Sequence, residues 1–162
     1  MIQEIYKDAV AEFVNIYLGQ AADLLSQITS QAIQLSVVQA YFLQADIHDE
    51  QIDQLLPHGH IVASSINFGQ LFKDKAYVVF PAQSAKCLVN ACMGDSMDVD
   101  GDYKLLDTDF DVIKEVGNIV INSVIGGFGN LLGLHICCSL PEIELVDIEG
   151  NSASTAFFLQ ED

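Results

Sequence analysis

The feature that most constrains this chain is a long helical pattern from Asp107 to Gly133. At about 100° per residue, apolar residues cover most of the circumference of this helix: Val112, Ile113, Val116, Ile119, Val120, Val124 and Phe128. The polar residues fall within an arc of roughly 60° by the same arithmetic: Asp111, Glu115, Asn118 and Asn122. A solvated helix face is wider and richer in Lys and Glu. The line therefore indicates a site, and its centre is the pair Glu115 and Asn118, which project to the same side of one turn.

The same polar line occurs once more, 103 residues earlier in the chain. At this offset three residues superpose on the second line: Asp8, Glu12 and Asn15 on Asp111, Glu115 and Asn118. Each line lies on a long helix that runs into a strand-like segment. This predicts a single domain over residues 1–162 that arose by internal duplication with a pseudo-twofold axis. The first half covers about 1–103 and the second about 104–162, so the second half is shortened.

The remaining elements follow from periodicity, β-branched content and turn residues. Besides the central helix, we expect helices at Glu4–Gln31, Asp49–Leu56 and Ala82–Met93. The expected strands are Ala32–Leu43, His60–Phe68, Tyr77–Phe80, Leu134–Leu140, Ile143–Val146 and Ala153–Leu159, with the second and third forming a hairpin. The predicted fold is α/β, with the two long helices packed side by side on one face of a mainly antiparallel sheet. The two polar lines should face solvent.

The charge of the chain limits the classes of partner that it can bind. The formal net charge is −17, from 23 acidic residues and six lysines, with no arginine. Phosphate contacts to nucleic acids rest on Lys and Arg, so no nucleic-acid partner is expected. The chain also lacks a cationic clamp of its own, so a partner would have to supply the positive charge for phosphate chemistry.

Other features place the protein in the cytoplasm. Residues Met1–Val10 lack a secretory signal pattern. The longest apolar run, Val116–Leu134, contains three asparagines, which makes insertion into a membrane costly. The four cysteines form no C-x-x-C pair and are read as reduced, buried thiols: Cys87, Cys92, Cys137 and Cys138.

Two weaker patterns have some features of metal sites. Ser96–Asp107 nearly fits a calcium loop, but it has Ser at the first position and Asp at the last, so an acidic solvated linker is favoured; whether 95–107 binds calcium stays open. His58 and His60 flank a probable turn at Gly59 and show no further metal-ligand spacing.

The residues of both lines resemble a known family. Glu115-Val116-Gly117-Asn118-Ile119, opened by Asp111, is similar to the signature of the CheC/CheX/FliY phosphatases of bacterial chemotaxis. The first copy, Glu12-Phe13-Val14-Asn15-Ile16, resembles the N-terminal motif of CheC, and the run from Phe80 to Ala85 resembles the step between the two halves. The similarity extends over roughly residues 8–146.

This resemblance implies a CheC-like fold and a phosphatase that acts on the aspartyl phosphate of a CheY-like response regulator. The regulator would bring Mg²⁺, a lysine and the phosphorylated carboxylate, so no cofactor of the chain's own is expected. Asn118 would hold the attacking water, Glu115 would contact the regulator's lysine, and Glu12 and Asn15 would do the same at the first site. An amide suits that role because it both donates and accepts hydrogen bonds and does not titrate.

Departures from the family qualify this expectation. The shortened second half leaves open sheet edges, so a homodimer is expected, and the loss of later elements makes docking of the deamidase CheD doubtful. At the first site Val14 occupies the position that Gly117 has at the second. We expect Val14 to hinder a partner helix, so the second site ranks above the first. Two alternatives remain: a non-catalytic docking module of the flagellar-switch type, and a calcium-responsive acidic binding protein.

Overall fold

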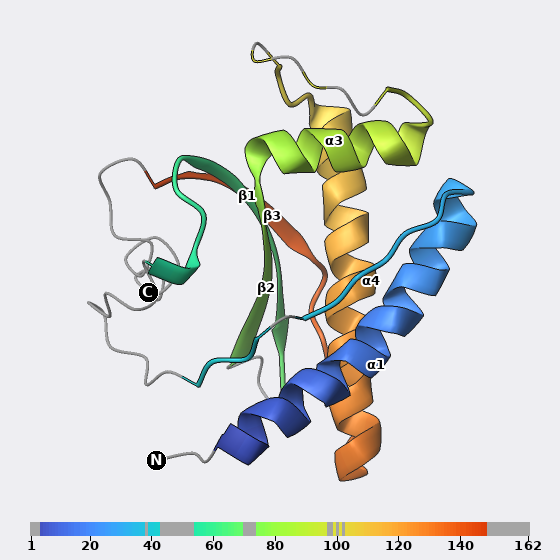
Figure 1. Ribbon diagram of the computed structural model, residues 1–162, viewed down its shortest axis with the longest axis vertical. Coiled ribbons are helices and arrows are strands. Elements are labelled where there is room, and N and C mark those ends of the chain that lie inside the picture. Colours follow the sequence, from blue (N-terminus) through green and yellow to red (C-terminus); the bar gives the residue numbers. More distant parts are fainter. Residues whose placement is uncertain are drawn as a thin grey trace.

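The computed structural model describes residues 4–37, 39–42, 54–69, 74–96, 99, 101 and 103–148. Within these residues, three helices pack against a three-stranded antiparallel sheet (Figure 1). The helices are α1 (Glu4–Thr29), α3 (Ala82–Met93) and α4 (Asp107–Leu132). The strands are β1 (His60–Phe68), β2 (Asp74–Pro81) and β3 (Glu142–Asp147). The mixed α/β architecture predicted from the sequence is therefore confirmed.

Strand β1 is the centre of the sheet, which has the order β2-β1-β3. It pairs with β2 as the expected hairpin, with Ser64 opposite Val78, and with β3, where Ser64 lies opposite Ile143. Residues Ile61 to Ile66 are all buried. Because side chains alternate along a strand, Val62 and Ile66 reach the helices, while the opposite face contributes to a second cluster with Ile148.

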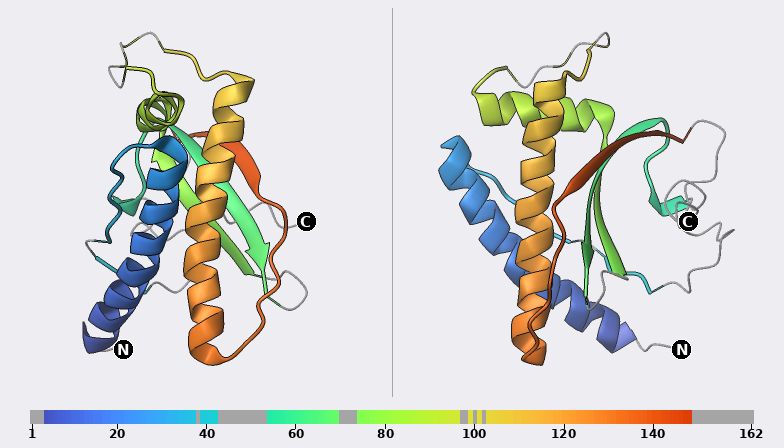
Figure 2. Two further views of the ribbon diagram at one scale, coloured as in Figure 1. Left: turned by 90° about the vertical axis from the view of Figure 1, so that its right-hand side faces the viewer. Right: turned by 180° about the vertical axis from the view of Figure 1, so that it is seen from behind.

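The long helices α1 and α4 lie side by side on the same side of the sheet (Figure 2). Helix α4 contacts all three strands, whereas α1 packs chiefly against α4 and α3. The ring of Phe13 in α1 packs at a tilt against that of Phe128 in α4, with ring centroids 4.4 Å apart. A Cβ placed at Gly127 would lie only 2.5 Å from the Tyr17 ring. The missing side chain at Gly127 thus lets α1 approach α4 closely.

Gly117 likewise allows α4 to approach the sheet closely. It is buried, and a Cβ at this position would lie 2.3 Å from Ser64 Oγ and 2.4 Å from Ser64 Cβ. The absence of a side chain at Gly117 therefore makes room for β1. The glycine faces β1, and its close approach fixes which side of α4 is turned outward.

Two strand predictions are wrong. In the described part of Ala32–Leu43 the chain is extended but belongs to no strand. Over Leu134–Leu140 the structure has only an isolated bridge between Cys138 and Phe68. There the Asn67 N–H donates to the Ser139 hydroxyl, at 3.0 Å, in place of a backbone carbonyl. Pro141 follows two residues later and has no N–H to donate.

The other boundaries agree within a few residues. The end of α4 is set by Gly133, which has φ 65°, a left-handed conformation that suits glycine. Leu134 N then donates to Gly129 O at 2.9 Å. Only the end of the helix predicted at Asp49–Leu56 falls within the described residues, and the strand predicted at Ala153–Leu159 lies outside them. The internal duplication and the division into halves stay predictions.

Candidate functional site

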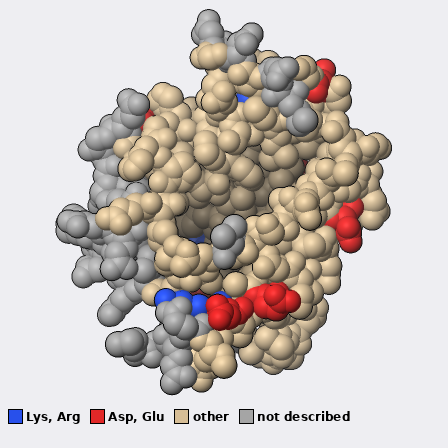
Figure 3. All heavy atoms as spheres, in the orientation of Figure 1, with Lys and Arg blue, Asp and Glu red and all other residues tan. Residues whose placement is uncertain are grey.

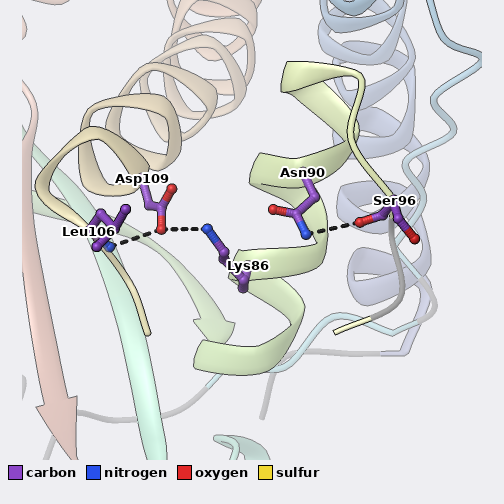
Figure 4. Close-up of polar contacts among 5 residues, drawn as sticks. All are labelled: Lys86, Asn90, Ser96, Leu106 and Asp109. Atoms are coloured by element: carbon purple, nitrogen blue, oxygen red, sulfur yellow. Dashed lines mark hydrogen bonds and ion pairs between the residues drawn. The ribbon is translucent and has the colours of Figure 1, made fainter. Parts of the chain in front are cut away.

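The N-terminus of α4 is fixed by a partly buried ion pair to α3. Asp109 Oδ2 accepts hydrogen bonds from Lys86 Nζ at 2.8 Å and from the Leu106 N–H at 2.9 Å (Figure 4). The second bond is the backward half of a capping box, with the acid three residues inside the helix. Also on α3, Asn90 Nδ2 donates a hydrogen bond to Ser96 O at 2.9 Å. Helix α3 therefore holds both the start of α4 and the start of the connection that leads to it.

The charge of Asp109 is stabilised by these contacts. Burial by itself would raise the pKa of this carboxyl, but the hydrogen bonds from Lys86 and the Leu106 N–H, together with the charge of Lys86, outweigh it. The pKa of Asp109 consequently lies below its ordinary value. The anion also lies in the first turn of α4, where the helix dipole favours negative charge.

The second polar line lies on the outer side of α4. Asp111, Glu115 and Asn122 are exposed, and Asn118 is half-buried. Glu115 makes no hydrogen bond or ion pair with any residue that the structure describes. Asn118 Oδ1 accepts a hydrogen bond from Asn122 Nδ2 at 2.6 Å. An amide oxygen has two lone pairs, so Asn118 can still accept a second hydrogen bond and can donate from its own Nδ2.

The first polar line is arranged differently. Glu12 is exposed, but the amide of Asn15 is bound to the backbone of Val37. Asn15 Oδ1 accepts from the Val37 N–H at 2.6 Å, and Asn15 Nδ2 donates to the Val37 carbonyl at 3.2 Å. Both ends of the side-chain amide are therefore engaged. This amide takes the place of a neighbouring strand for the extended segment.

A second residue of α1 supports the same segment, residues 32–37, which we call the strap. The Ser26 hydroxyl accepts from the Ile33 N–H at 2.9 Å. Ser26 and Asn15 lie eleven residues apart, close to three helical turns, so both project to one face. Along the strap Ile33, Leu35 and Val37 are half-buried and the residues between them are exposed. The period-two pattern read as a strand is real, but its hydrogen-bond partners are helix side chains.

The strap borders an apolar hollow of about 310 Å³. Its lining comes from α1, α3, α4, β2 and the strap: Leu18, Leu25, Ile33, Leu35, Ser36, Val78, Phe80, Leu88, Val116 and Val120. The face shown in Figure 3 is hollowed in its middle and is largely uncharged there, with the acidic side chains toward its margins. A second hollow of about 180 Å³ lies beside the polar line of α4, and Asn122, Asn130 and His135 are among its lining residues.

The weaker sequence patterns gain little from the structure. Asp98, Asp100 and Asp102 lie outside the described residues, so the calcium loop is not tested. Within the described part of the chain, no three His, Cys, Asp or Glu side chains gather as a metal site. His60 Nδ1 lies 3.7 Å from Asp147 Oδ2 across two strands. No helix in that part is long and apolar enough to span a bilayer.

All four cysteines are free thiols. Cys137 is exposed, which corrects the expectation that all four are buried, because neighbouring residues of an extended segment point to opposite sides. Burial raises the pKa of the Cys92 thiol, and burial, with the neighbouring Cys137, raises that of Cys138. Raised thiol pKa values are the opposite of what a nucleophilic cysteine needs.

Comparison with known proteins adds the fold relationship. A scan of family models and a search of curated proteins both give no match. Among solved structures, the crystal structure of Thermotoga maritima FliY matches with a TM-score of 0.77, over 93% of this chain and 73% of that one, at 21% sequence identity. The chain has the fold of FliY. The resemblance read from the two polar lines is thereby confirmed at the level of the fold.

In this FliY-like fold the polar line of α4 lies where the sequence pattern predicted it, but the contacts of Asn15 and Ser26 with the strap were not predicted. Val37 binds both ends of the Asn15 amide, Ser26 accepts from Ile33, and Asn122 donates to the Asn118 amide. Asn122 was visible in the sequence as the last member of the line. The partners of the strap had no signal, because they depend on which residues of α1 face a segment that leaves the helix and turns back along it.

Proposed function

We propose that this protein is a phosphatase of a CheY-like response regulator, and that Glu115 and Asn118 are its working site. The water held by Asn118 attacks the phosphorus of the aspartyl phosphate. A new P–O bond forms as the bond to the aspartyl oxygen breaks, which yields inorganic phosphate and the free carboxylate. Positioning supplies most of the acceleration in such reactions.

The observation that carries this proposal is the exposure and hydrogen bonding of the Glu115 and Asn118 side chains. Glu115 is exposed on the outer side of α4, free to meet a cation of the partner, and it lies one turn from an amide that retains donors and an acceptor. A carboxylate and a lysine form a charge-assisted pair. The chain has no arginine, so in this proposal the cation and the metal ion come from the regulator. Both proteins are proposed to act in the cytoplasm.

The first line is proposed to serve the fold, because both ends of the Asn15 amide are bound to Val37. This observation also gives some support to a second candidate function. A protein in which neither line is catalytic would be a docking module that binds the regulator without hydrolysis.

One experiment separates the two functions. A CheY-like regulator is phosphorylated, and release of inorganic phosphate is followed with wild-type protein, with Asn118→Ala and with Asn15→Ala, while binding is measured separately. The phosphatase requires that Asn118→Ala slow release about 100-fold with little change in binding, and that Asn15→Ala leave the rate unchanged. Binding without acceleration by the wild type identifies the docking module.

Glu115 is tested in the same assay. Glu115→Gln removes the charge and keeps the shape, so it should raise KM for the phosphorylated regulator about 2- to 10-fold and leave kcat near the wild-type value. A loss confined to kcat would contradict the docking role of this carboxylate.

A further inference from the structure

Asn122 is hydrogen-bonded to the amide of Asn118 one turn away on α4. A side-chain amide can rotate by 180° about its last torsion and exchange its oxygen and nitrogen with almost no change of shape. The Nδ2 of Asn122 lies 2.6 Å from the Oδ1 of Asn118 and donates to it. With this bond in place, the Asn118 oxygen faces Asn122 and its NH₂ group is the end left for other partners.

The first helix lacks an equivalent of Asn122. At the offset of 103 residues its counterpart is Gly19, which is exposed and has open space where a Cβ would lie. Asn15 therefore has no amide one turn further on, and its own amide is bound to the Val37 backbone instead. Of Asn15 and Asn118, only Asn118 keeps a free end of its amide, and only Asn118 has a neighbouring amide one turn further on.

We propose that Asn122 is a positioning residue, which acts on the reaction only through the orientation of the Asn118 amide; this inference rests on the proposed function. Asn122 contacts neither the water nor the regulator's phosphoryl group in this scheme. Its bond keeps the population of Asn118 in the orientation that presents donors and one remaining lone pair to the water.

The position of Asn122 makes the idea testable without damage to the core. The side chain is exposed and lines the hollow of about 180 Å³ beside α4. Truncation at this position therefore removes a hydrogen bond but leaves no buried cavity. Asn130 is the matched control, because it is exposed on the same helix and lines the same hollow, and its side chain makes no hydrogen bond to Asn118.

The test is a double-mutant cycle in the phosphate-release assay. One ordinary hydrogen bond maintains a population ratio of about 3 to 10 between the two orientations. Its loss in Asn122→Ala leaves them about equally populated, so kcat should fall by up to about 2-fold with KM unchanged. In the Asn118→Ala background the same change should have no effect. Asn122→Gln, which keeps an NH₂ donor on that helix face, should recover much of the rate, and Asn130→Ala should match the wild type.

Each other outcome overturns the inference. An equal slowing by Asn122→Ala in the Asn118→Ala background would show that Asn122 acts independently, and a change in KM alone would show that it contacts the regulator. Wild-type acceleration that Asn122→Ala leaves intact would reject the positioning role while the phosphatase stands. A wild type without acceleration rejects both. The side-chain amide NMR signal of Asn118 provides a readout besides turnover, because it should shift in Asn122→Ala and stay in place in Asn130→Ala.

Discussion

The close contact of Gly117 with β1 yields a prediction whose size can be worked out from the structure. In Gly117→Ala the added Cβ meets Ser64 Oγ at 2.3 Å and Ser64 Cβ at 2.4 Å, distances at which something must move. Gly126 lies nine residues further along the same helix, and a Cβ there meets no atom within 4 Å. Both glycines are interior to α4, so the intrinsic helix preference changes alike in the two variants.

Replacing glycine by alanine inside a helix favours folding by about 1 kcal/mol. Gly126→Ala should therefore raise the free energy of unfolding by up to about that amount. Gly117→Ala gains the same term but also carries the overpacking cost of about 1–3 kcal/mol. The helix term cancels in the difference between the variants, which should be about 1–3 kcal/mol in favour of Gly126→Ala. For a chain of this size that corresponds to roughly 2–12 °C in Tm.

Urea unfolding followed by circular dichroism measures both variants against the wild type. A third variant locates the cause: Ser64→Gly removes both atoms that meet the new Cβ, so Gly117→Ala with Ser64→Gly should be more stable than the sum of the single effects. Ser64→Ala should rescue less, because its Cβ remains in place. Equal stabilities of Gly117→Ala and Gly126→Ala would refute the view that this contact fixes the rotation of α4.

Three further predictions concern other contacts of the fold. Asp109→Asn should lower the free energy of unfolding at pH 7 by about 1–3 kcal/mol because it leaves Lys86 without its partner. The pKa of Asp109 is lowered on folding, so its contribution is complete above the ordinary value of 3.8 and is lost as the pH falls through the folded-state pKa. The deficit of Asp109→Asn in urea titrations should therefore shrink as the pH falls below the ordinary value, and a deficit that grows on acidification would contradict the assignment. Asn15→Ala should lower the free energy of unfolding by about 1–2 kcal/mol, since the Val37 N–H and carbonyl lose their partner, with no effect on phosphate release; a stability equal to that of the wild type would show that the strap is not held by Asn15. Val120→Ile adds one methyl group at the apolar hollow and should raise the free energy of unfolding by about 0.8 kcal/mol, measured as an increase in Tm, whereas a decrease would show that the hollow cannot accept the group.

Local patterns predicted most of the helices and the central hairpin because their hydrophobic periods are long and unambiguous. The period of α4 placed Glu115 and Asn118 on one side, and the fold turns that side outward. Gly133 and the acid at position 109 marked where the helix ends and begins through turn and cap chemistry. These are properties of a few neighbouring residues, which the sequence displays directly.

The parts that could not be predicted depend on contacts between distant segments. Residues 32–37 alternate like a strand, but whether such a segment joins a sheet or lies on a helix depends on which hydrogen-bond partners are in reach. Here Asn15 and Ser26 provide them. The close packing of Gly117 on Ser64 could not be predicted for the same reason, because it depends on which strand the helix meets.

The central claim, that Asn118 completes an aspartyl-phosphate site supplied by a partner, is tested most directly by single-turnover phosphate release from a phosphorylated CheY-like regulator at saturating protein. The account predicts that the wild type accelerates release, that Asn118→Ala loses about 100-fold of that rate, and that both proteins bind the regulator with similar affinity. A wild type that binds the regulator and leaves its rate of phosphate loss unchanged, or an Asn118→Ala variant as fast as the wild type, would contradict it.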